Sequence, residues 1–126
     1  MNCGRVLDAA ALVTFASRAS VYAEAFVWTA VEEGLVLVVP SSAVVQAWAH
    51  LEDKDHPVLD VLLRLPVTVA DDLTVARARS VGAWGGDPVN AHALLCASEC
   101  GWPLITGDAS CYTAGSTRGV DLEPLP

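Results

Sequence analysis

The hydrophobic and polar positions along the chain alternate between short apolar runs and longer stretches with helical spacing. Val6 and Leu7 form one apolar run, and good helix formers follow over residues 9–16. Residues 35–39 are wholly apolar and rich in β-branched side chains, which is typical of a parallel strand covered on both faces. Further strands are predicted at 67–69, at 103–106 and near 120–122. This alternation predicts a three-layer α/β/α domain whose central, mainly parallel sheet has four to five strands.

Local signals mark the ends of two predicted helices. Apolar residues recur at helical spacing over residues 21–33, and Gly34 supplies the stop. Asp87 before Pro88 predicts a second helix start, with the aspartate as cap and the proline in the first turn. That helix is expected to run to about residue 100 and to be closed by Gly101.

The middle of the chain carries weaker signals. Either Ser41 or Ser42 is expected to cap a helix that runs to about residue 51. Asp71 and Asp72 are predicted at a helix N-terminus, where carboxylates suit the positive end of the helix dipole. Apolar helical stripes also contain Trp28 and Trp48, which are therefore expected in the core or in a dimer interface.

Length and composition indicate one globular domain spanning residues 1–126. Apolar residues make up 53% of the chain and charged residues 17%, which excludes intrinsic disorder. The longest apolar run, residues 35–40, is far shorter than the roughly 20 residues of a membrane span, so no membrane association is expected. The four cysteines form neither a disulfide scaffold nor paired CxxC motifs, which favours a reduced, cytoplasmic setting.

The chain is strongly acidic, with a net charge of −8. Proteins that grip nucleic acid by broad phosphate neutralisation use a lysine or arginine for each contact. The seven basic residues here do not support that mode of binding. Nucleic-acid chemistry on this chain therefore requires added cations.

Three acidic residues from distant parts of the chain are predicted at one edge of the sheet. Asp8 and Asp108 directly follow predicted strands, and Asp87 begins a helix that returns along the sheet. Ligand sites of parallel α/β sheets lie at this carboxyl edge. Clustered carboxylates remain ionised when a divalent cation neutralises them, and oxygen ligands select Mg²⁺ or Mn²⁺. Each aspartate alone also suits a structural role as a helix cap or turn residue.

Several segments resemble the PIN-domain nucleases, including the toxin ribonucleases of VapBC type. The opening Val6-Leu7-Asp8 is similar to the strand and first acidic motif of that family. The segment 87–94, which begins with Asp87, is similar to the third motif, and Pro103–Asp108 to the fourth, where a strand ends in Thr-x-Asp. The resemblance covers nearly the whole chain in order.

The resemblance implies Mg²⁺-dependent hydrolysis of single-stranded RNA. Asp8, Asp87 and Asp108 would hold one or two Mg²⁺ or Mn²⁺ ions, and Thr106 would hydrogen-bond a carboxylate or a metal-bound water. It also implies a homodimer and an antitoxin protein as partners.

One position departs from the family pattern. Where the family carries a glutamate in the helix after the second strand, this chain has Gln46, whose amide has no negative charge and no basic function. His50, one turn away, is a weak substitute candidate. The sequence therefore leaves two functions open: a weak ribonuclease, and a catalytically impaired PIN-like module that binds a protein.

A zinc site is a further interpretation of the sequence. His92, Cys96 and Cys100 follow one another at four-residue intervals on one predicted helix, and Cys111 is available as a fourth ligand. Buried thiols on a core-facing helix are the commoner explanation of such a stripe. Arg77, on another helix, is expected to lie on the solvated surface.

Overall fold

A computed structural model describes residues 3–126 and contains one five-stranded parallel sheet. Its strand order is β3-β2-β1-β4-β5, and every neighbouring pair is parallel. The strands are β1 (Gly4–Leu7), β2 (Val36–Pro40), β3 (Thr68–Asp71), β4 (Leu104–Thr106) and β5 (Leu122–Pro124). The predicted fold class is confirmed, although the last strand lies slightly later than the predicted 120–122.

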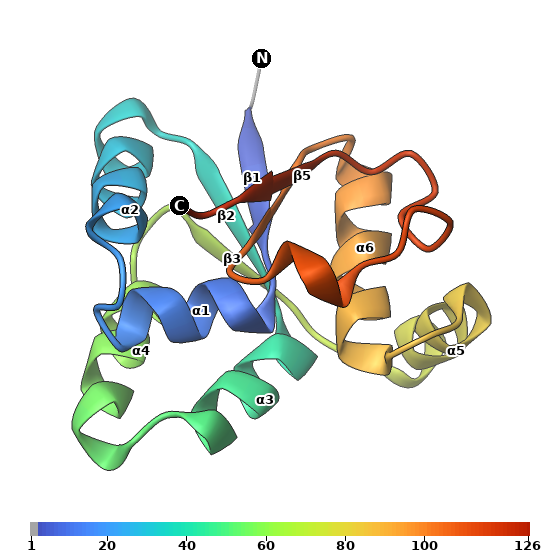
Figure 1. The fold of residues 1–126 in the computed structure, drawn as a ribbon, viewed down its shortest axis with the longest axis horizontal. Coiled ribbons are helices and arrows are strands. Elements are labelled where there is room, and N and C mark those ends of the chain that lie inside the picture. Colours follow the sequence, from blue (N-terminus) through green and yellow to red (C-terminus); the bar gives the residue numbers. More distant parts are fainter. Residues whose placement is uncertain (1–2) are drawn as a thin grey trace.

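Helices cover both faces of this sheet (Figure 1). The α-helices are α1 (Ala9–Ala16), α2 (Val21–Glu33), α3 (Ser41–His50), α4 (His56–Leu63), α5 (Val75–Trp84) and α6 (Pro88–Cys100). Two single 3₁₀ turns complete the elements, η1 (Asp53–Asp55) and η2 (Ala109–Cys111). Within the described residues, no helix has the length and apolarity that a bilayer crossing needs.

Alternate side chains of the central strands supply two separate hydrophobic cores. Leu37 and Val39 of β2 join a cluster with α1, α2, α3 and α4. Val38, the residue between them, joins a second cluster with Val6 and the buried face of α6. A strand that is buried on both faces explains why its sequence is continuously apolar.

The helix ends with strong local signals lie where the sequence predicts them. Gly34 and Gly101 adopt left-handed φ values of 71° and 69°, which allow them to end α2 and α6. Asp87 accepts hydrogen bonds from the backbone N–H groups of Val89 and Asn90 at the start of α6. These predictions are confirmed because each depends only on adjacent residues.

The predictions for two other helix starts are wrong. Asp71 is the last residue of β3, opposite Pro40 of β2, and α5 begins only after the cap Thr74. Pairing with the longer neighbouring strand extends β3 to Asp71. Helix α3 follows Pro40 without a side-chain cap, because the hydroxyls of Ser41 and Ser42 bond to distant residues.

The tryptophans of α2 and α3 lie outside the core. Trp28 is 68% exposed, and Trp48 stacks against the ring of His56 with 4.0 Å between the ring centroids. The prediction of a core position for Trp28 is therefore wrong. Its exposure leaves a large apolar side chain on the surface of α2.

Candidate active site

Asp8 lies where β1 passes into α1. Its Oδ1 accepts a hydrogen bond of 2.8 Å from the backbone N–H of Ala11, which makes Asp8 the N-cap of α1. Its Oδ2 accepts a hydrogen bond of 2.7 Å from the hydroxyl of Tyr112, in the segment after β4. Asp8 is only 2% exposed. The strand, the helix and the later segment together hold this carboxylate in place.

The surroundings of Asp8 act on its ionisation in opposite directions. Burial raises the pKa of Asp8, and hydrogen bonds from Thr106, Tyr112 and the backbone of Ala11 and Gly107 offset part of that rise. Burial and the charge of Asp8 also raise the pKa of Tyr112, so its hydroxyl stays protonated and remains a donor. A cation near Asp8 would favour its ionised form.

Thr106 connects Asp8 with Asp108. Its buried hydroxyl donates to the Asp8 carboxylate and accepts a hydrogen bond of 3.0 Å from the backbone N–H of Asp108. The ends of β1 and β4 are thereby joined through one side chain. The sequence interpretation suggested that Thr106 hydrogen-bonds a carboxylate or a metal-bound water, and this role stays a prediction.

Asp108 itself is exposed at the start of η2. Its carboxylate accepts hydrogen bonds from the backbone N–H and hydroxyl of Ser110, and the Cys111 thiol donates to it at 3.4 Å. The bonds from Ser110, with a further one from Cys111, hold the pKa of Asp108 below its usual value. This carboxylate is ionised and open to solvent.

Gly107 is required for the close approach of this strand end to α1. A Cβ atom at Gly107 would lie 2.5 Å from the carbonyl oxygen of Ala10 and 2.6 Å from Oγ1 of Thr14. Only glycine therefore fits between β4 and α1. The residue immediately before Asp108 sets how close that acid lies to Asp8.

The three predicted acids all influence Cys111 of η2, the turn that lies between α1 and α6 in Figure 1. Partial burial raises the pKa of the Cys111 thiol, and the charges of Asp108, Asp8 and Asp87 raise it further. All three carboxylates therefore act on one side chain. Their oxygen atoms do not form a group within 4.8 Å of one another, because among the described residues only Asp71, His92 and Cys96 do so.

Two neighbouring cavities open beside Asp108 and Asp87, and the buried Asp8 lines neither of them. A cavity of about 340 Å³ is lined by Asp108, Gln46 and His50, together with residues of α1. A smaller cavity of about 160 Å³ is lined by Asp87 and residues of α6. Cys111 lines both cavities. Gln46 thus shares a solvent-filled space with Asp108, and His50 bonds through its ring to the backbone oxygen of Gln46 at 2.9 Å.

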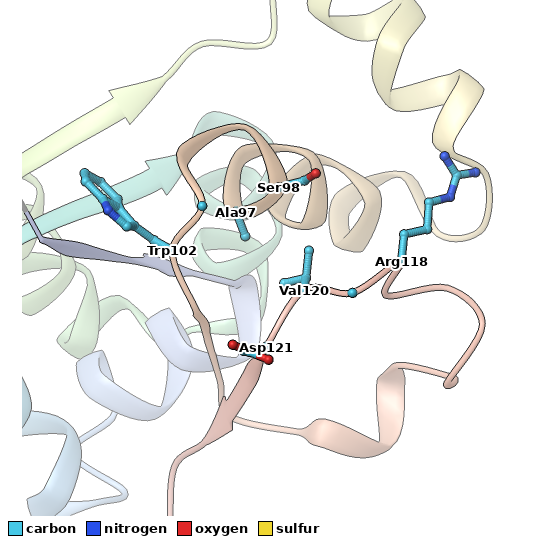
Figure 2. A pocket seen from close by; sticks show the side chains of 8 residues that line it. Ala97, Ser98, Trp102, Arg118, Val120 and Asp121 are labelled. Carbon is cyan, nitrogen blue, oxygen red and sulfur yellow. The ribbon is translucent and has the colours of Figure 1, made fainter.

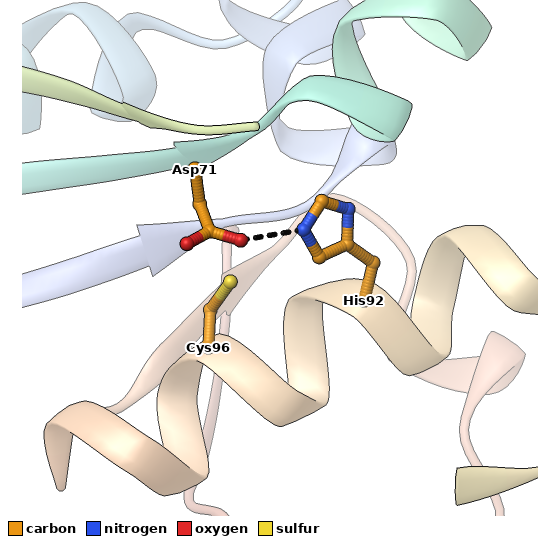
Figure 3. Close-up of side chains that lie close together, drawn as sticks. All are labelled: Asp71, His92 and Cys96. Carbon is orange, nitrogen blue, oxygen red and sulfur yellow. Dashed lines mark hydrogen bonds and ion pairs between the residues drawn. The ribbon is translucent and has the colours of Figure 1, made fainter. Parts of the chain in front are cut away.

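A second polar cluster lies between the end of β3 and α6 (Figure 3). His92 Nε2 lies 2.7 Å from Oδ2 of Asp71, and Arg77 also contacts Asp71 and Glu99. The expectation of a solvated Arg77 is wrong, because two carboxylates hold its guanidinium. Cys111 bonds to Asp108 instead, and the close group among the described residues contains Asp71 and not Cys100, so the zinc interpretation was wrong about both of these cysteines.

Sequence reasoning missed Tyr112, Asp71 and Ser42. Tyr112 bonds to a residue 104 positions away, Asp71 was assigned to a helix start, and Ser42 was assigned to a cap. A usable signal existed only for Asp71, which closely follows the predicted strand 67–69 as Asp8 and Asp108 closely follow theirs.

A further cavity of about 170 Å³ lies at the far end of α6 from Asp87 (Figure 2). Trp102 and Arg118 line it, and Asp121 is its single carboxylate. A lone carboxylate offers too few oxygen donors for a magnesium site, so this cavity is not a candidate for the active site.

Comparison with known proteins supports the fold and gives no closer relationship. No protein-family model matches the chain, and no curated protein matches its sequence. A similar solved structure is a chain from the crystal structure of VapBC2 from Rickettsia felis bound to a DNA fragment from their promoter. The TM-score is 0.70, and the match covers 97% of this chain and 98% of that chain at 10% sequence identity. This chain therefore shares its fold with that chain over nearly its whole length.

Proposed function

We propose that this protein is a divalent-metal-dependent endoribonuclease of PIN type that cleaves single-stranded RNA. The observation that supports the proposal is that Asp8 and Asp108 come directly after the ends of β1 and β4, while Asp87 lines a cavity together with Cys111 of η2. Parallel α/β sheets bind ligands at such carboxyl ends of their strands. The similarity of fold to a chain of the VapBC2 structure also supports this proposal.

The donor set suits Mg²⁺ or Mn²⁺. All three side chains offer carboxylate oxygens, which are the hard ligands that these ions prefer. Mg²⁺ usually keeps several waters and takes only one or two carboxylates directly, so the separation of the three acids agrees with such a site. A cation bound there supplies Lewis acidity that activates water and neutralises charge on the phosphate.

The other residues of the site orient its carboxylates. Tyr112 and Thr106 donate to Asp8, and Ser110 donates to Asp108. These fixed donors reduce the reorganisation needed when a cation and RNA bind. Tyr112 keeps its proton and therefore acts as a positioning group for Asp8.

A second candidate function follows from Gln46. This residue lines the cavity beside Asp108 at the place where the PIN-domain family carries a glutamate. Its amide oxygen can orient a water but adds no charge to hold a cation. A PIN-like module that binds a protein without cleaving RNA is the alternative consistent with that change.

The deciding experiment measures cleavage of a labelled single-stranded RNA with Mn²⁺ or Mg²⁺. We expect the wild type to cleave slowly, and Asp8→Asn and Asp108→Asn to lose at least roughly tenfold in rate, about 1.4 kcal/mol of barrier. Asp121→Asn is the matched control, because Asp121 lines only the distant cavity. Equal rates in all four proteins would contradict the nuclease proposal.

The substitution Gln46→Glu separates the two candidate functions. If the wild type is a weak nuclease, the added carboxylate raises an existing metal-dependent rate. If the wild type does not cleave and Gln46→Glu does, the binding-module alternative is correct. Metal titrations of both proteins complete the comparison, because an added carboxylate is expected to lower the metal concentration at half-maximal rate.

We further propose a homodimer and an antitoxin-like protein as partners. A groove of about 450 Å³ between α2 and α4 is lined mostly by apolar side chains, including the exposed Trp28. Exposed apolar grooves of this kind mark protein interaction sites. Light scattering of the wild type and of Trp28→Ser tests the dimer. A monomeric wild type contradicts the dimer. A dimer that persists in Trp28→Ser means that the groove is not the dimer interface and is the surface for the antitoxin-like protein.

A further inference from the structure

A group of three different metal-ligating side chains lies apart from the proposed nuclease site. Asp71 comes from the end of β3, and His92 and Cys96 lie one turn apart on α6. Their ligand atoms all lie within 4.8 Å of one another. Figure 3 shows the carboxylate, the imidazole and the thiol directed toward a common point.

The imidazole of His92 is already held in an orientation suited to metal binding. Its ring is completely buried, with Nδ1 2.7 Å from the Ser42 hydroxyl and Nε2 2.7 Å from Oδ2 of Asp71. Histidines that bind metals usually hold the other ring nitrogen in such a hydrogen bond, which fixes the tautomer. At 2.7 Å from the ionised Asp71 carboxylate, Nε2 carries the ring proton and donates it, and Nδ1 accepts from the Ser42 hydroxyl. When a metal binds Nε2, the ring proton moves to Nδ1, where the Ser42 oxygen accepts it.

The charged side chains at this group are two carboxylates and one guanidinium, so one negative charge is in excess. Arg77 is the cation that contacts both nearby carboxylates, with Nη2 3.1 Å from Asp71 and Nη1 2.6 Å from Glu99. Two carboxylates therefore share one guanidinium. Nη2 of Arg77 also lies 3.7 Å from Sγ of Cys96, so a positive group already occupies the space beside the three ligand atoms.

We propose that Asp71, His92 and Cys96 form a Zn²⁺ site distinct from the magnesium-type site. The nitrogen and sulfur donors suit zinc, a softer cation than Mg²⁺. In a tetrahedral zinc site the ligand atoms stand roughly 3.3–3.6 Å apart, so the present spacing needs only small adjustments. Three protein ligands leave one position for solvent.

Charge is conserved when zinc binds. The Cys96 thiol loses its proton to solvent, and the thiolate and the Asp71 carboxylate together neutralise the two charges of the ion. Arg77 leaves Asp71 and keeps its two close contacts with Glu99. The arginine thus competes with the metal for Asp71, and this competition gives the proposal a specific test.

Cobalt is the probe, because Co²⁺ takes tetrahedral zinc sites and reports thiolate ligation by a charge-transfer band. We expect the purified wild-type chain to give this band with Co²⁺ and to lose it on adding Zn²⁺. Cys96→Ser should abolish the band. Cys111→Ser is the matched control and should keep it, because Cys111 lies at the other site. A band that is absent in the wild type, or that follows Cys111 instead of Cys96, would overturn the proposal.

Arg77→Gln tests the same site without removing a ligand. Loss of the competing guanidinium should tighten Zn²⁺ binding several-fold, measured by competition with a chromogenic chelator. Asp71→Asn should weaken binding in the same assay. Circular dichroism of each variant verifies the fold. Unchanged or weaker binding by a folded Arg77→Gln would overturn the proposal that zinc displaces Arg77 from Asp71, whatever the outcome of the RNA cleavage assay.

Discussion

Asp8 and Asp71 both lie at the end of a strand, yet their surroundings shift the pKa values of the two carboxyl groups in opposite directions. Burial raises the pKa of Asp8 despite its hydrogen-bond donors. Burial also acts to raise the pKa of Asp71, but bonds from His92, Cys96 and Arg77 outweigh it, so the pKa of Asp71 is lowered. Asp8 is also the more deeply buried of the two carboxylates, so the rise due to burial is harder for its hydrogen bonds to offset.

Asp8 is consequently expected to oppose stability at neutral pH. A group with a raised folded-state pKa contributes stability that is present below its unfolded pKa of 3.8 and lost as pH rises through the folded value. Asp8→Asn has no carboxyl group to ionise and therefore avoids this loss of stability at neutral pH. The hydroxyls of Tyr112 and Thr106 can turn to accept hydrogen bonds from the new amide. We expect Asp8→Asn to unfold at the same temperature as the wild type or a higher one at pH 7, and to lose RNA cleavage.

The measurement is thermal unfolding of both proteins from pH 3 to pH 8. The advantage of Asp8→Asn should shrink as pH falls toward the unfolded pKa, because the wild-type carboxyl is then protonated in both states. Asp71→Asn provides the opposite case, since the lowered pKa of Asp71 means that its carboxylate stabilises the fold above pH 3.8. A stability difference for Asp8→Asn that does not change with pH would contradict this account.

At the level of elements, the site depends on how closely β4 packs against α1. Gly107→Ala would place a methyl group against the backbone of Ala10, which cannot move without disturbing α1. We expect a loss of about 1–3 kcal/mol in the free energy of unfolding, the usual range for overpacking. Urea denaturation measures it.

Gly82→Ala is the matched control for that substitution. Gly82 lies inside α5, and nothing lies within 4 Å of a Cβ added there. Alanine is a better helix former than glycine, so this variant should gain about 0.5–1 kcal/mol. Similar effects of the two substitutions on the free energy of unfolding would mean that close packing against α1 is not the reason for glycine at position 107.

The ends of the helices and strands show which structural features can be predicted from sequence. The cap Asp87-Pro88 and the helix-ending glycines act through adjacent residues, so the ends of α6 were predictable. The end of β3 depends on pairing with Pro40, and the cluster of Asp71 with His92 depends on how α6 packs over the sheet. Tyr112 donates to Asp8 across 104 positions, and no local pattern encodes that contact. The assignment of Asp8, Asp87 and Asp108 to one site stays a prediction that rests on strand ends sharing one edge, and the sequence could not predict that their oxygens form no close group.

For the whole molecule, the net charge of −8 limits how RNA can bind. The three candidate ligands account for only part of the acid excess, and Arg77 is held by two carboxylates. Arg118 lies over the ring of Trp84, 4.5 Å from its centroid, and donates to the Trp84 carbonyl. Few arginines are therefore free to neutralise phosphates.

RNA binding should therefore require a divalent cation and depend only weakly on monovalent salt. Each phosphate contact on a single strand contributes about −0.7 to the slope of log affinity against log salt concentration. With one or two arginine contacts, we expect a slope of roughly −1, measured by fluorescence anisotropy with Ca²⁺ in place of the catalytic ion. Without divalent cation the signal should vanish, as it should for Asp108→Asn. A steep salt dependence that persists in the presence of a chelator would instead reveal a basic surface elsewhere, and would separate RNA binding from the acidic site.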